Sequence, residues 1–221
     1  MILSVICPVL NGEKYISNNI LTFFVNSKPM DKELLIIDGG STDSTIKIVK
    51  DWCQKYSNIK LIHNRHKYVP HALNIGIKES KGQFISRLDV HTIYPKNYFE
   101  KCIELIKTIN ADNIGGTIIS CGVSTCGKAI AHSMSSLFGV GNSTPRIKDY
   151  DGYVDTVAFG FWNKQVFDKY GLFDETLIKN QDEDHNYLII ENGGMVYQSS
   201  IIKTHYFVRE KIIDFIKQMF Y

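Results

Sequence analysis

The sequence predicts an α/β fold with a mainly parallel central sheet flanked by helices, and three observations lead to that prediction. Short apolar runs alternate with longer stretches whose apolar residues fall at helical spacing, and the alternation repeats four times before about residue 109. Repeats of this kind form right-handed β-α-β units. One run, residues 34–37, is continuously apolar, as expected of a parallel strand buried on both faces. The third observation is size, because 221 residues, 44% of them hydrophobic, suffice for one domain with a large core.

The first half of the chain supplies most of the expected elements. Strands are expected where the apolar runs lie, at residues 4–9, 34–37, 59–62, 84–88 and 113–120. Helices are expected at residues 15–26, after a cap formed by residues 41–43, at residues 70–80 and at residues 98–109. In sheets of this type ligands bind beyond the carboxyl ends of the strands, so the polar residues that follow each strand are candidates for the site.

The second half is less regular. Residues 113–145 carry one formal charge, Lys128, and many Gly and Ser residues. We expect a loop with one short helix near residues 129–138 there, in preference to a membrane segment, because Gly, Ser, Thr and His interrupt the apolar residues too often. A further strand is expected over residues 154–159. A helix is expected over residues 181–191, whose acidic start suits the positive end of a helix dipole.

The last fifteen residues, 207–221, are amphipathic. One face of the expected helix carries four apolar side chains, namely Ile212, Phe215, Ile216 and Met219. Two interpretations are open: a helix that packs on its own domain, and an interfacial helix that lies on a membrane surface.

Composition excludes several classes of protein. The net charge of +2 leaves no broad basic face, so no nucleic-acid partner is expected. The five cysteines are scattered and odd in number, which argues against a disulfide framework, makes a zinc site unfavourable and indicates a reducing compartment. The apolar N-terminus has no basic region and no cleavage site, and therefore predicts a first strand rather than a signal peptide. We expect a cytoplasmic protein.

The triplet Asp89-Val90-His91 follows the fourth expected strand. Alternate residues at a strand end share a face, so the carboxylate and the imidazole can reach one ion. This pair suits Mg²⁺ or Mn²⁺ whose other ligands are phosphate oxygens and water. The alternative is a strand-ending Asp89 that caps the next segment, with His91 uninvolved.

Residues 38–43, D-G-G-S-T-D, form a glycine turn between a buried strand and a helix N-terminus. Backbone and ligand can approach closely there, and the helix dipole favours an anion. The segment matches neither a Walker loop nor the G-x-G-x-x-G spacing of dinucleotide binders. An acid at the strand end, Asp38, can accept hydrogen bonds from a ribose hydroxyl or a base N–H. The alternative is a tight β-α turn capped by Ser41 or Asp43.

Residues 181–185, Q-D-E-D-H, bring three acids together at the start of a helix. A carboxylate among like charges is a candidate general base. A solvated helix start is the alternative. The upstream residues 171–174, G-L-F-D, are expected to form a turn that packs against this helix.

Taken together, these motifs resemble the family-two glycosyltransferases of the GT-A fold. Residues 7–11, C-P-V-L-N, are similar to the family's V-x-P-x-Y-N, with Leu10 where Tyr is common. Residues 35–45 resemble I-D-D-G-S-T-D-x-T, with Gly39 in place of the second Asp. Residues 71–76 and 81–82 match the A-x-N-x-G and x-G segments that precede the D-x-D strand, and the D-x-H triplet stands where D-x-D would be.

Three later segments look like one branch of that family, the succinoglycan-type exopolysaccharide glycosyltransferases, in which D-x-H is common. They are residues 139–142, 154–160 and 171–175. Relatives often continue into a membrane-associated region, whereas this sequence stops within the amphipathic tail. Truncation there is therefore one expectation, as is a peripheral location at the inner face of the cell membrane.

The resemblance implies transfer of a sugar from a nucleotide diphosphate donor, expected to be a UDP-sugar, with inversion, to a polysaccharide or lipid-linked saccharide acceptor. The implied donor-binding residues are Pro8, Asn11, Asp38, Gly40, Ser41, Asn74, Arg87 and Asp89. Asp89 and His91 would hold Mg²⁺ or Mn²⁺ on the diphosphate. The general base would be Asp182, with Asp184 as the second choice, and the acceptor residues would be Gly160, Trp162 and Gln181.

Three residues depart from the family's motif around the base. Gln181 replaces the usual Glu, His185 the usual Leu, and Leu188 a common Arg. Gln keeps the hydrogen bonding and loses the charge, which can lower activity or alter the acceptor site. The base is expected to be intact because Asp182 remains.

The chain is interpreted as a single GT-A domain, residues 1–221. Within it, residues 1–121 would bind the nucleotide, residues 122–206 the acceptor, and residues 207–221 would form the amphipathic tail. Two other functions are considered. A sugar nucleotidyltransferase would need a Gly-rich, basic N-terminal loop, which residues 8–12 lack. A non-catalytic nucleotide-sugar-binding subunit is suggested by the departures at Gly39, His91 and Gln181.

Overall fold

A computed structural model describes residues 1–25, 30–136, 144–147 and 149–220. Its strands are β1 (Leu3–Val9), β2 (Lys32–Asp38), β3 (Ile59–His63), β4 (Phe84–Arg87), β5 (Thr92–Ile93), β6 (Asn113–Cys121), β7 (Gly152–Tyr153), β8 (Phe161–Asn163) and β9 (Val196–Phe207). Its helices are α1 (Ile16–Val25), α2 (Thr45–Lys55), α3 (Val69–Glu79), α4 (Tyr98–Thr108), α5 (Thr125–Ser133), α7 (Thr144–Ile147), α8 (Gln165–Tyr170), α9 (Gln181–Glu191) and α10 (Ile212–Phe220).

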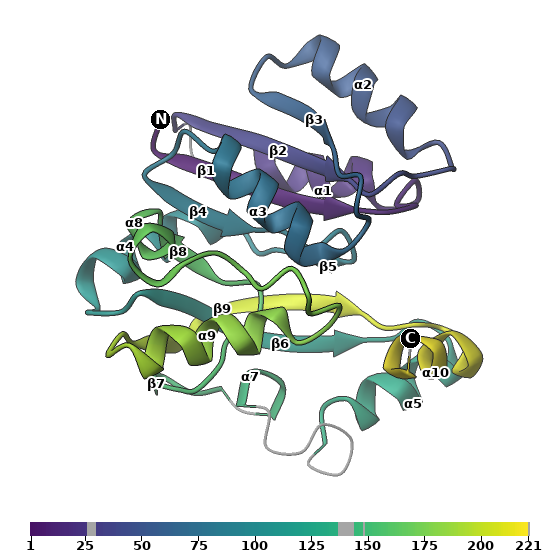
Figure 1. Ribbon diagram of the computed structural model, residues 1–221. Coiled ribbons are helices and arrows are strands. Elements are labelled where there is room, and N and C mark those ends of the chain that lie inside the picture. The colour runs from purple at the N-terminus through teal and green to yellow at the C-terminus, as the bar shows by residue number, and fades with distance from the viewer. Residues whose placement is uncertain (26–29, 137–143, 148, 221) are drawn as a thin grey trace.

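The strands form one sheet in the order β3-β2-β1-β4-β8-β6-β9-β5, with β7 paired to β9 (Figure 1). The pairs β1–β2, β2–β3 and β1–β4 are parallel, as predicted for the first half of the chain. In the second half β6 and β9 are parallel to each other, while β8 runs antiparallel to both β4 and β6. The predicted α/β fold with a mainly parallel sheet is therefore confirmed.

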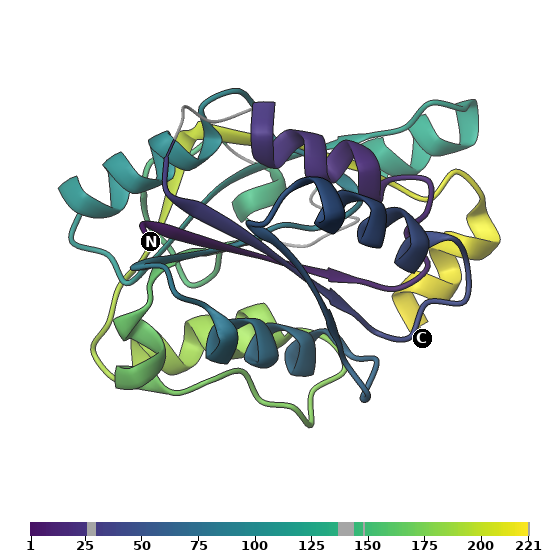
Figure 2. The same cartoon turned by 90° about the horizontal axis from the view of Figure 1, so that it is seen from above.

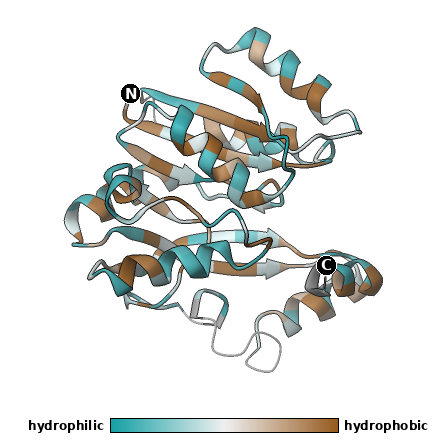
Figure 3. Ribbon diagram, viewed as in Figure 1, coloured by the Kyte–Doolittle hydropathy of each residue, from teal (hydrophilic) through white to brown (hydrophobic). Residues whose placement is uncertain are grey.

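Helices cover both faces of the sheet. Seen from above, α1 and α2 lie on one side, and α3 and α9 lie on the other (Figure 2). Strand β2 shows why both faces are needed: its four central residues, Leu34 to Ile37, are fully buried. Leu34 and Ile36 belong to the core under α1, whereas Leu35 and Ile37 belong to the core under α3. Alternate strand residues point to opposite faces, so a continuous apolar run requires two cores. Figure 3 shows this hydrophobic run on β2.

The strand predicted over residues 154–159 is wrong. The regular strand in this region is β8, Phe161–Asn163, and residues 154–159 run without a ladder. Side chains replace the missing strand neighbours, because Asn186 Nδ2 donates to the Thr156 hydroxyl at 3.1 Å and to the Val157 carbonyl at 3.2 Å. Phe159 has φ +57°, a left-handed backbone that cannot continue a strand.

The short helix predicted near residues 129–138 begins earlier than expected. Helix α5 starts at Thr125, because Ser124 caps it and its hydroxyl accepts a hydrogen bond from the Gly127 amide at 2.9 Å. Residues 137–138 and the motif at residues 139–142 lie outside the described residues.

The C-terminal helix α10 has one packed side chain and several exposed ones. Phe215 packs against a small core that includes Ile118, whereas Ile212, Ile213 and Ile216 are 61%, 62% and 46% exposed. Each interpretation of the tail therefore accounts for part of this helix. The side chain of Met219 lies outside what the structure describes. Within the described ranges, no helix combines the length and the apolar character that crossing a membrane requires.

Candidate active site

The loops after β1 and β2 are hydrogen bonded to each other. The Asn11 amide donates to the Ser41 hydroxyl at 2.8 Å, and Asn11 Oδ1 accepts from the Thr42 amide at 2.8 Å. The Gly12 amide donates to the Thr45 hydroxyl at 2.8 Å. Asn11 has φ +52°, a conformation that Asn tolerates better than most residues. Two predicted donor-binding residues, Asn11 and Ser41, are thus brought together at the carboxyl ends of neighbouring strands.

Asp38 is 2% exposed, and its carboxylate folds back onto its own loop. One oxygen, Oδ2, accepts from the amide of Gly40 at 2.9 Å and from that of Ser41 at 3.1 Å. Gly40 has φ +89°, so a side chain there would be strained, although the space around it is open. The alternative of a tight turn describes this geometry. The predicted contact of Asp38 with a nucleoside stays a prediction, as does that of Pro8, whose backbone lies in β1 beside Ile37.

The D-x-H triplet lies directly beyond β4. Asp89 Oδ1 accepts from the His91 amide at 2.8 Å, the capping bond of the alternative interpretation. The Asp89 backbone is held on both sides, by Tyr94 through a 2.7 Å bond to its amide and by Asn19 through a 3.0 Å bond to its carbonyl. The His91 ring meets the Tyr15 ring edge-on, with centroids 4.7 Å apart. Both predicted metal ligands are therefore fixed at one strand end.

The chemistry of this pair fits a divalent cation. Burial lowers the pKa of His91, the Asp89 carboxylate opposes that shift, and the Arg209 charge adds to it. The net direction favours the neutral imidazole, which is the form that binds metals. No cluster of three or more metal-ligating side chains occurs in the described parts of the chain. Two protein ligands would therefore leave the other positions to phosphate oxygens and water, as Mg²⁺ prefers at phosphate-transfer sites.

A partly buried ion pair joins helix α9 to the end of β4. Arg87 Nη1 donates to both carboxylate oxygens of Asp182, each at 2.6 Å, and the two side chains are 9% and 24% exposed. Burial lowers the pKa of Arg87, but the charges of Asp182 and Asp89 outweigh it, so the net shift is upward. Arg87 was predicted to contact the donor; in this structure its partner is the predicted base. The pair brings the acidic helix next to the D-x-H triplet.

A cavity of about 200 Å³ opens beside this pair. Gln181, Asp182 and Glu183 line it from α9, and Arg146 lines it from α7. Asp184 is exposed and is not among its lining residues. Of the two carboxylates considered as base, Asp182 is therefore the one that faces a space where an acceptor could bind.

Two predicted acceptor residues are buried rather than at the surface. Trp162 is 2% exposed and packs against Phe167, Phe173 and His185. A side chain at Gly160 would collide with the Trp162 ring at 2.1 Å. The structure does not bring these two residues to the cavity, and of the three predicted acceptor residues only Gln181 lines it.

Asn74, a predicted donor-binding residue, joins α3 to the segment before α9. Its amide nitrogen donates to the Phe173 carbonyl and to Glu175 Oε1, each at 2.9 Å, and its oxygen accepts from the Phe173 amide at 3.0 Å. The turn at Gly171 packs on the acidic helix as predicted, since its carbonyl lies 3.1 Å from His185 Nε2. Asn74 is thus connected to α9 through this turn.

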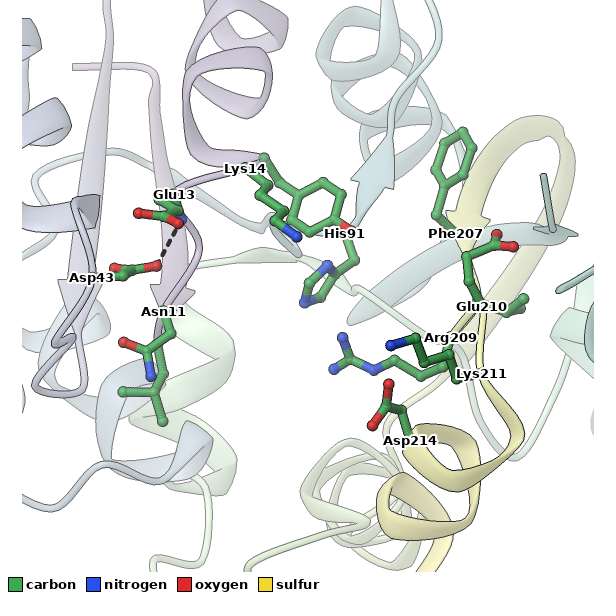
Figure 4. Close-up of a pocket in the computed structure, with 13 residues that line it drawn as sticks. Asn11, Glu13, Lys14, Asp43, His91, Phe207, Arg209, Glu210, Lys211 and Asp214 are labelled. Carbon is green, nitrogen blue, oxygen red and sulfur yellow. Dashed lines mark hydrogen bonds between the residues drawn. The ribbon is translucent and has the colours of Figure 1, made fainter. Parts of the chain in front are cut away.

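A larger cavity, of about 550 Å³, lies between the loop after β1 and residues 207–214 (Figure 4). Lys14, His91, Arg209 and Lys211 line it. The sequence interpretation missed Arg209 and Lys211 because it treated the tail only as an amphipathic helix, and it missed Lys14 because that residue belongs to none of the motifs. Strand β9 carries its apolar residues in separated pairs and not in alternation, so the local pattern gave little signal that a strand leads the chain back to this site.

Comparisons with known proteins agree with the family resemblance. A family model described as Glycosyl transferase family 2 matches residues 4–171. A Methanococcus voltae glycosyltransferase acting on dolichyl N-acetyl-α-D-glucosaminyl phosphate is 28% identical over 98% of this chain and 70% of its own length. The succinoglycan biosynthesis protein ExoA of Rhizobium meliloti is 24% identical over 98% of this chain. The chain spans 66% of ExoA's length.

Solved structures share the fold. TarS of S. aureus, in complex with UDP-GlcNAc, superposes with a TM-score of 0.72 at 19% identity, covering 96% of this chain and 60% of TarS. GalNAc-T7, with UDP, GalNAc and Mn²⁺, gives a TM-score of 0.75 at 15% identity, covering 96% of this chain and 44% of that one. Both are GT-A transferases, which confirms the predicted GT-A fold. The chain belongs to glycosyl transferase family 2.

Proposed function

We propose that the chain transfers a glycosyl unit, with inversion, from a UDP-sugar to a saccharide or lipid-linked saccharide acceptor. The observation that carries this proposal is the Arg87–Asp182 ion pair, because it joins the candidate base to the strand that ends in the D-x-H triplet. The candidate base then lies close to the site of the leaving diphosphate. A single displacement needs both groups at the same sugar carbon, on its opposite faces. The names of relatives support the substrate classes: TarS was solved with UDP-GlcNAc, and the M. voltae relative acts on a dolichyl-linked acceptor.

In this proposal the acceptor hydroxyl attacks the anomeric carbon while its proton passes to Asp182. The bond from that carbon to the diphosphate oxygen breaks, and the electron pair leaves with the nucleotide. A carboxylate has about four lone-pair sites, so the two bonds from Arg87 leave room for an acceptor hydroxyl. Arg87 acts as a positioning residue, because it fixes the carboxylate beside the cavity. Proton transfer to a positioned general base such as Asp182 typically raises the rate by about 10²–10⁴-fold.

Asp89 and His91 would hold Mg²⁺ or Mn²⁺, which when bound neutralises charge on the leaving diphosphate. The Mn²⁺ in the GalNAc-T7 structure supports a divalent ion in this fold. Asn11, Gly40 and Ser41, on the joined loops after β1 and β2, would bind the nucleoside end of the donor. Asp38 would have two roles there. Its carboxylate holds the loop in shape, and a remaining lone pair would accept a hydrogen bond from the nucleoside.

The test is Asp182→Asn, measured as release of UDP from a panel of UDP-sugars with a saccharide acceptor. The variant keeps the shape and removes the base, so turnover should fall by about 10²–10⁴-fold, while the affinity for UDP stays unchanged. Glu183→Gln is the matched control, since Glu183 lines the same cavity and has no role in the proposal. Unchanged turnover in Asp182→Asn, or an equal loss in the control, would contradict the assignment.

We also propose that α10 rests on a membrane surface, at the inner face of the cell membrane. Its exposed isoleucines, Ile212, Ile213 and Ile216, lie between Lys211 and Lys217, a pattern suited to an anionic bilayer. Flotation with vesicles of anionic lipid tests this. Binding should be lost when Ile212 and Ile213 are both changed to Ser, and equal flotation of both proteins would remove the proposal.

A further inference from the structure

The cavity of about 550 Å³ is bounded on one side by residues 207–214, here called the C-terminal segment. Its other walls come from the loop after β1 and from the D-x-H triplet. In Figure 4 the nitrogen-bearing ends of Lys14, His91, Arg209 and Lys211 all point into the same space. These residues come from three separate segments of the sequence, and no motif used to identify the family includes Lys14, Arg209 or Lys211.

The position of the C-terminal segment is fixed relative to the triplet. Strand β5, which follows His91, pairs with the end of β9, and the Phe207 amide donates to the His91 carbonyl at 3.2 Å. The Val208 amide donates to the Cys121 carbonyl at 3.0 Å. Arg209 therefore follows directly after two residues that are held by backbone hydrogen bonds.

Glu210 fastens the middle of the segment to α5. Its carboxylate accepts from the amides of Val123 and Ser124 at 2.9 and 2.8 Å, and also from the Ser124 hydroxyl. With Glu210 turned toward α5, its neighbours Arg209 and Lys211 face the cavity (Figure 4). This makes Glu210 a positioning residue for both cations.

The acids and the cations around the cavity differ in their partners. Three of the four acids that line the cavity, Glu13, Asp43 and Glu210, accept hydrogen bonds from backbone amides. The fourth, Asp214, is exposed on the first turn of α10 and forms no ion pair with a cation of the described residues. For the side chains of Lys14, Arg209 and Lys211, no hydrogen bond or ion pair occurs with any part of the chain that the structure describes. Three cations without an acceptor, converging on one cavity, call for an anionic ligand.

We propose that Lys14, Arg209 and Lys211 bind the diphosphate of the nucleotide donor, so that the C-terminal segment completes the donor site. This inference rests on the proposed function and adds three residues to it. The cavity favours the donor diphosphate over a phosphate on the acceptor for two reasons. His91, the candidate metal ligand, lines it, and so does Asn11 from the donor loops. The cavity beside Asp182 shares none of these residues.

The experiment compares three ligands that differ only in phosphate number: UDP, UMP and uridine. Calorimetry with Mn²⁺ present would be done on the wild type, on the double variant R209A/K211A, and on K217A. Lys217 is the matched control, because it lies on α10 and does not line the cavity. Charged hydrogen bonds to phosphate predict that the double variant binds UDP at least about tenfold more weakly. The loss should be smaller for UMP and absent for uridine, and K217A should match the wild type.

Unchanged UDP affinity in the double variant would overturn the inference, and so would an equal loss for uridine, which would mean that the segment only supports packing. If UDP affinity is unchanged in the double variant but its KM for the acceptor is raised, the two cations belong to the acceptor site and not to the donor site.

Inorganic pyrophosphate is titrated in parallel. If the wild type binds pyrophosphate but not UDP, the proposal of a UDP-sugar donor is refuted. Comparing the pyrophosphate affinity of the wild type with that of R209A/K211A would still test whether the two cations bind phosphate groups. Equal melting temperatures exclude misfolding as the cause of any loss.

Discussion

The two sides of the candidate active site are built in different ways. On the side of β1 and β2, two loops follow strands whose side chains are almost all buried. The loops hydrogen bond to each other, from the Asn11 amide to Ser41 and from the Gly12 amide to Thr45. On the other side, the C-terminal segment is held by Glu210 and two backbone bonds, and α10 leaves three isoleucines exposed.

The difference bears on what each side can do. Loops joined by many hydrogen bonds keep one shape before a ligand arrives, so they suit recognition of a rigid nucleoside. A segment with few buried contacts opens at lower free-energy cost. We therefore expect the side of β1 and β2 to carry the stability of the fold, and the C-terminal side to respond to ligand and surface.

The largest expected effect is on the buried sheet. Ile36→Ala removes a fully buried side chain from β2 and should lower the free energy of unfolding by about 2–5 kcal/mol. Ile213→Ala on α10 changes the same side chain where it is 62% exposed, and should cost less than about 0.5 kcal/mol. Urea unfolding measures both. Similar losses for the two variants would remove the distinction between the two sides.

A smaller effect is expected where α3 meets the turn before α9. Asn74→Ala leaves the Phe173 amide and carbonyl without their buried partner and should destabilise the fold by about 1–3 kcal/mol. Turnover should fall as well, because the turn supports the helix that carries Asp182. Gln54→Ala, at an exposed position of α2, is the control. If Asn74→Ala weakens UDP binding and leaves stability unchanged, Asn74 contacts the donor directly, as the family motif predicts.

The smallest effect is a pH dependence that arises from His185. Burial lowers the pKa of this histidine in the folded protein, and its bond to the Gly171 carbonyl only partly opposes that shift. The unfolded chain, with a pKa of about 6.5, then binds the proton more readily than the folded one. The stability that the neutral His185 contributes is fully present above the unfolded pKa, and it is lost as the pH falls from that value through the lower pKa of the folded protein.

His185→Leu should remove this part of the pH dependence, and His63→Gln, at an exposed position, should leave it unchanged. Melting temperatures between pH 5 and pH 8 provide the measurement. An identical slope for His185→Leu and the wild type would mean that another group causes it.

The sequence was informative where structure follows from local pattern. The run at residues 34–37 predicted a strand buried on both faces, and each of its residues is buried. The D-x-H triplet was predicted to follow the fourth strand, and it lies directly beyond β4; that its two side chains bind a metal stays a prediction. Prediction succeeded there because strand periodicity and turn chemistry involve neighbouring residues only.

Prediction failed where distant residues decide the local structure. The path of residues 154–159 depends on hydrogen bonds from Asn186, and β5 exists because it pairs with the end of β9. The same pairing brings Arg209 to the triplet, so its place in the site could not be inferred from the tail itself. The ion pair of Arg87 with Asp182 likewise joins residues that no motif connects.

The central claim is that a nucleotide diphosphate binds at the D-x-H triplet with a divalent ion. Calorimetry of UDP with and without Mn²⁺ tests it most directly, on the wild type, on Asp89→Ala and on the control Asp51→Ala from the exposed side of α2. The account predicts Mn²⁺-dependent binding in the wild type and the control, and its loss in Asp89→Ala. Binding of equal strength in all three proteins, with or without the ion, would contradict the claim.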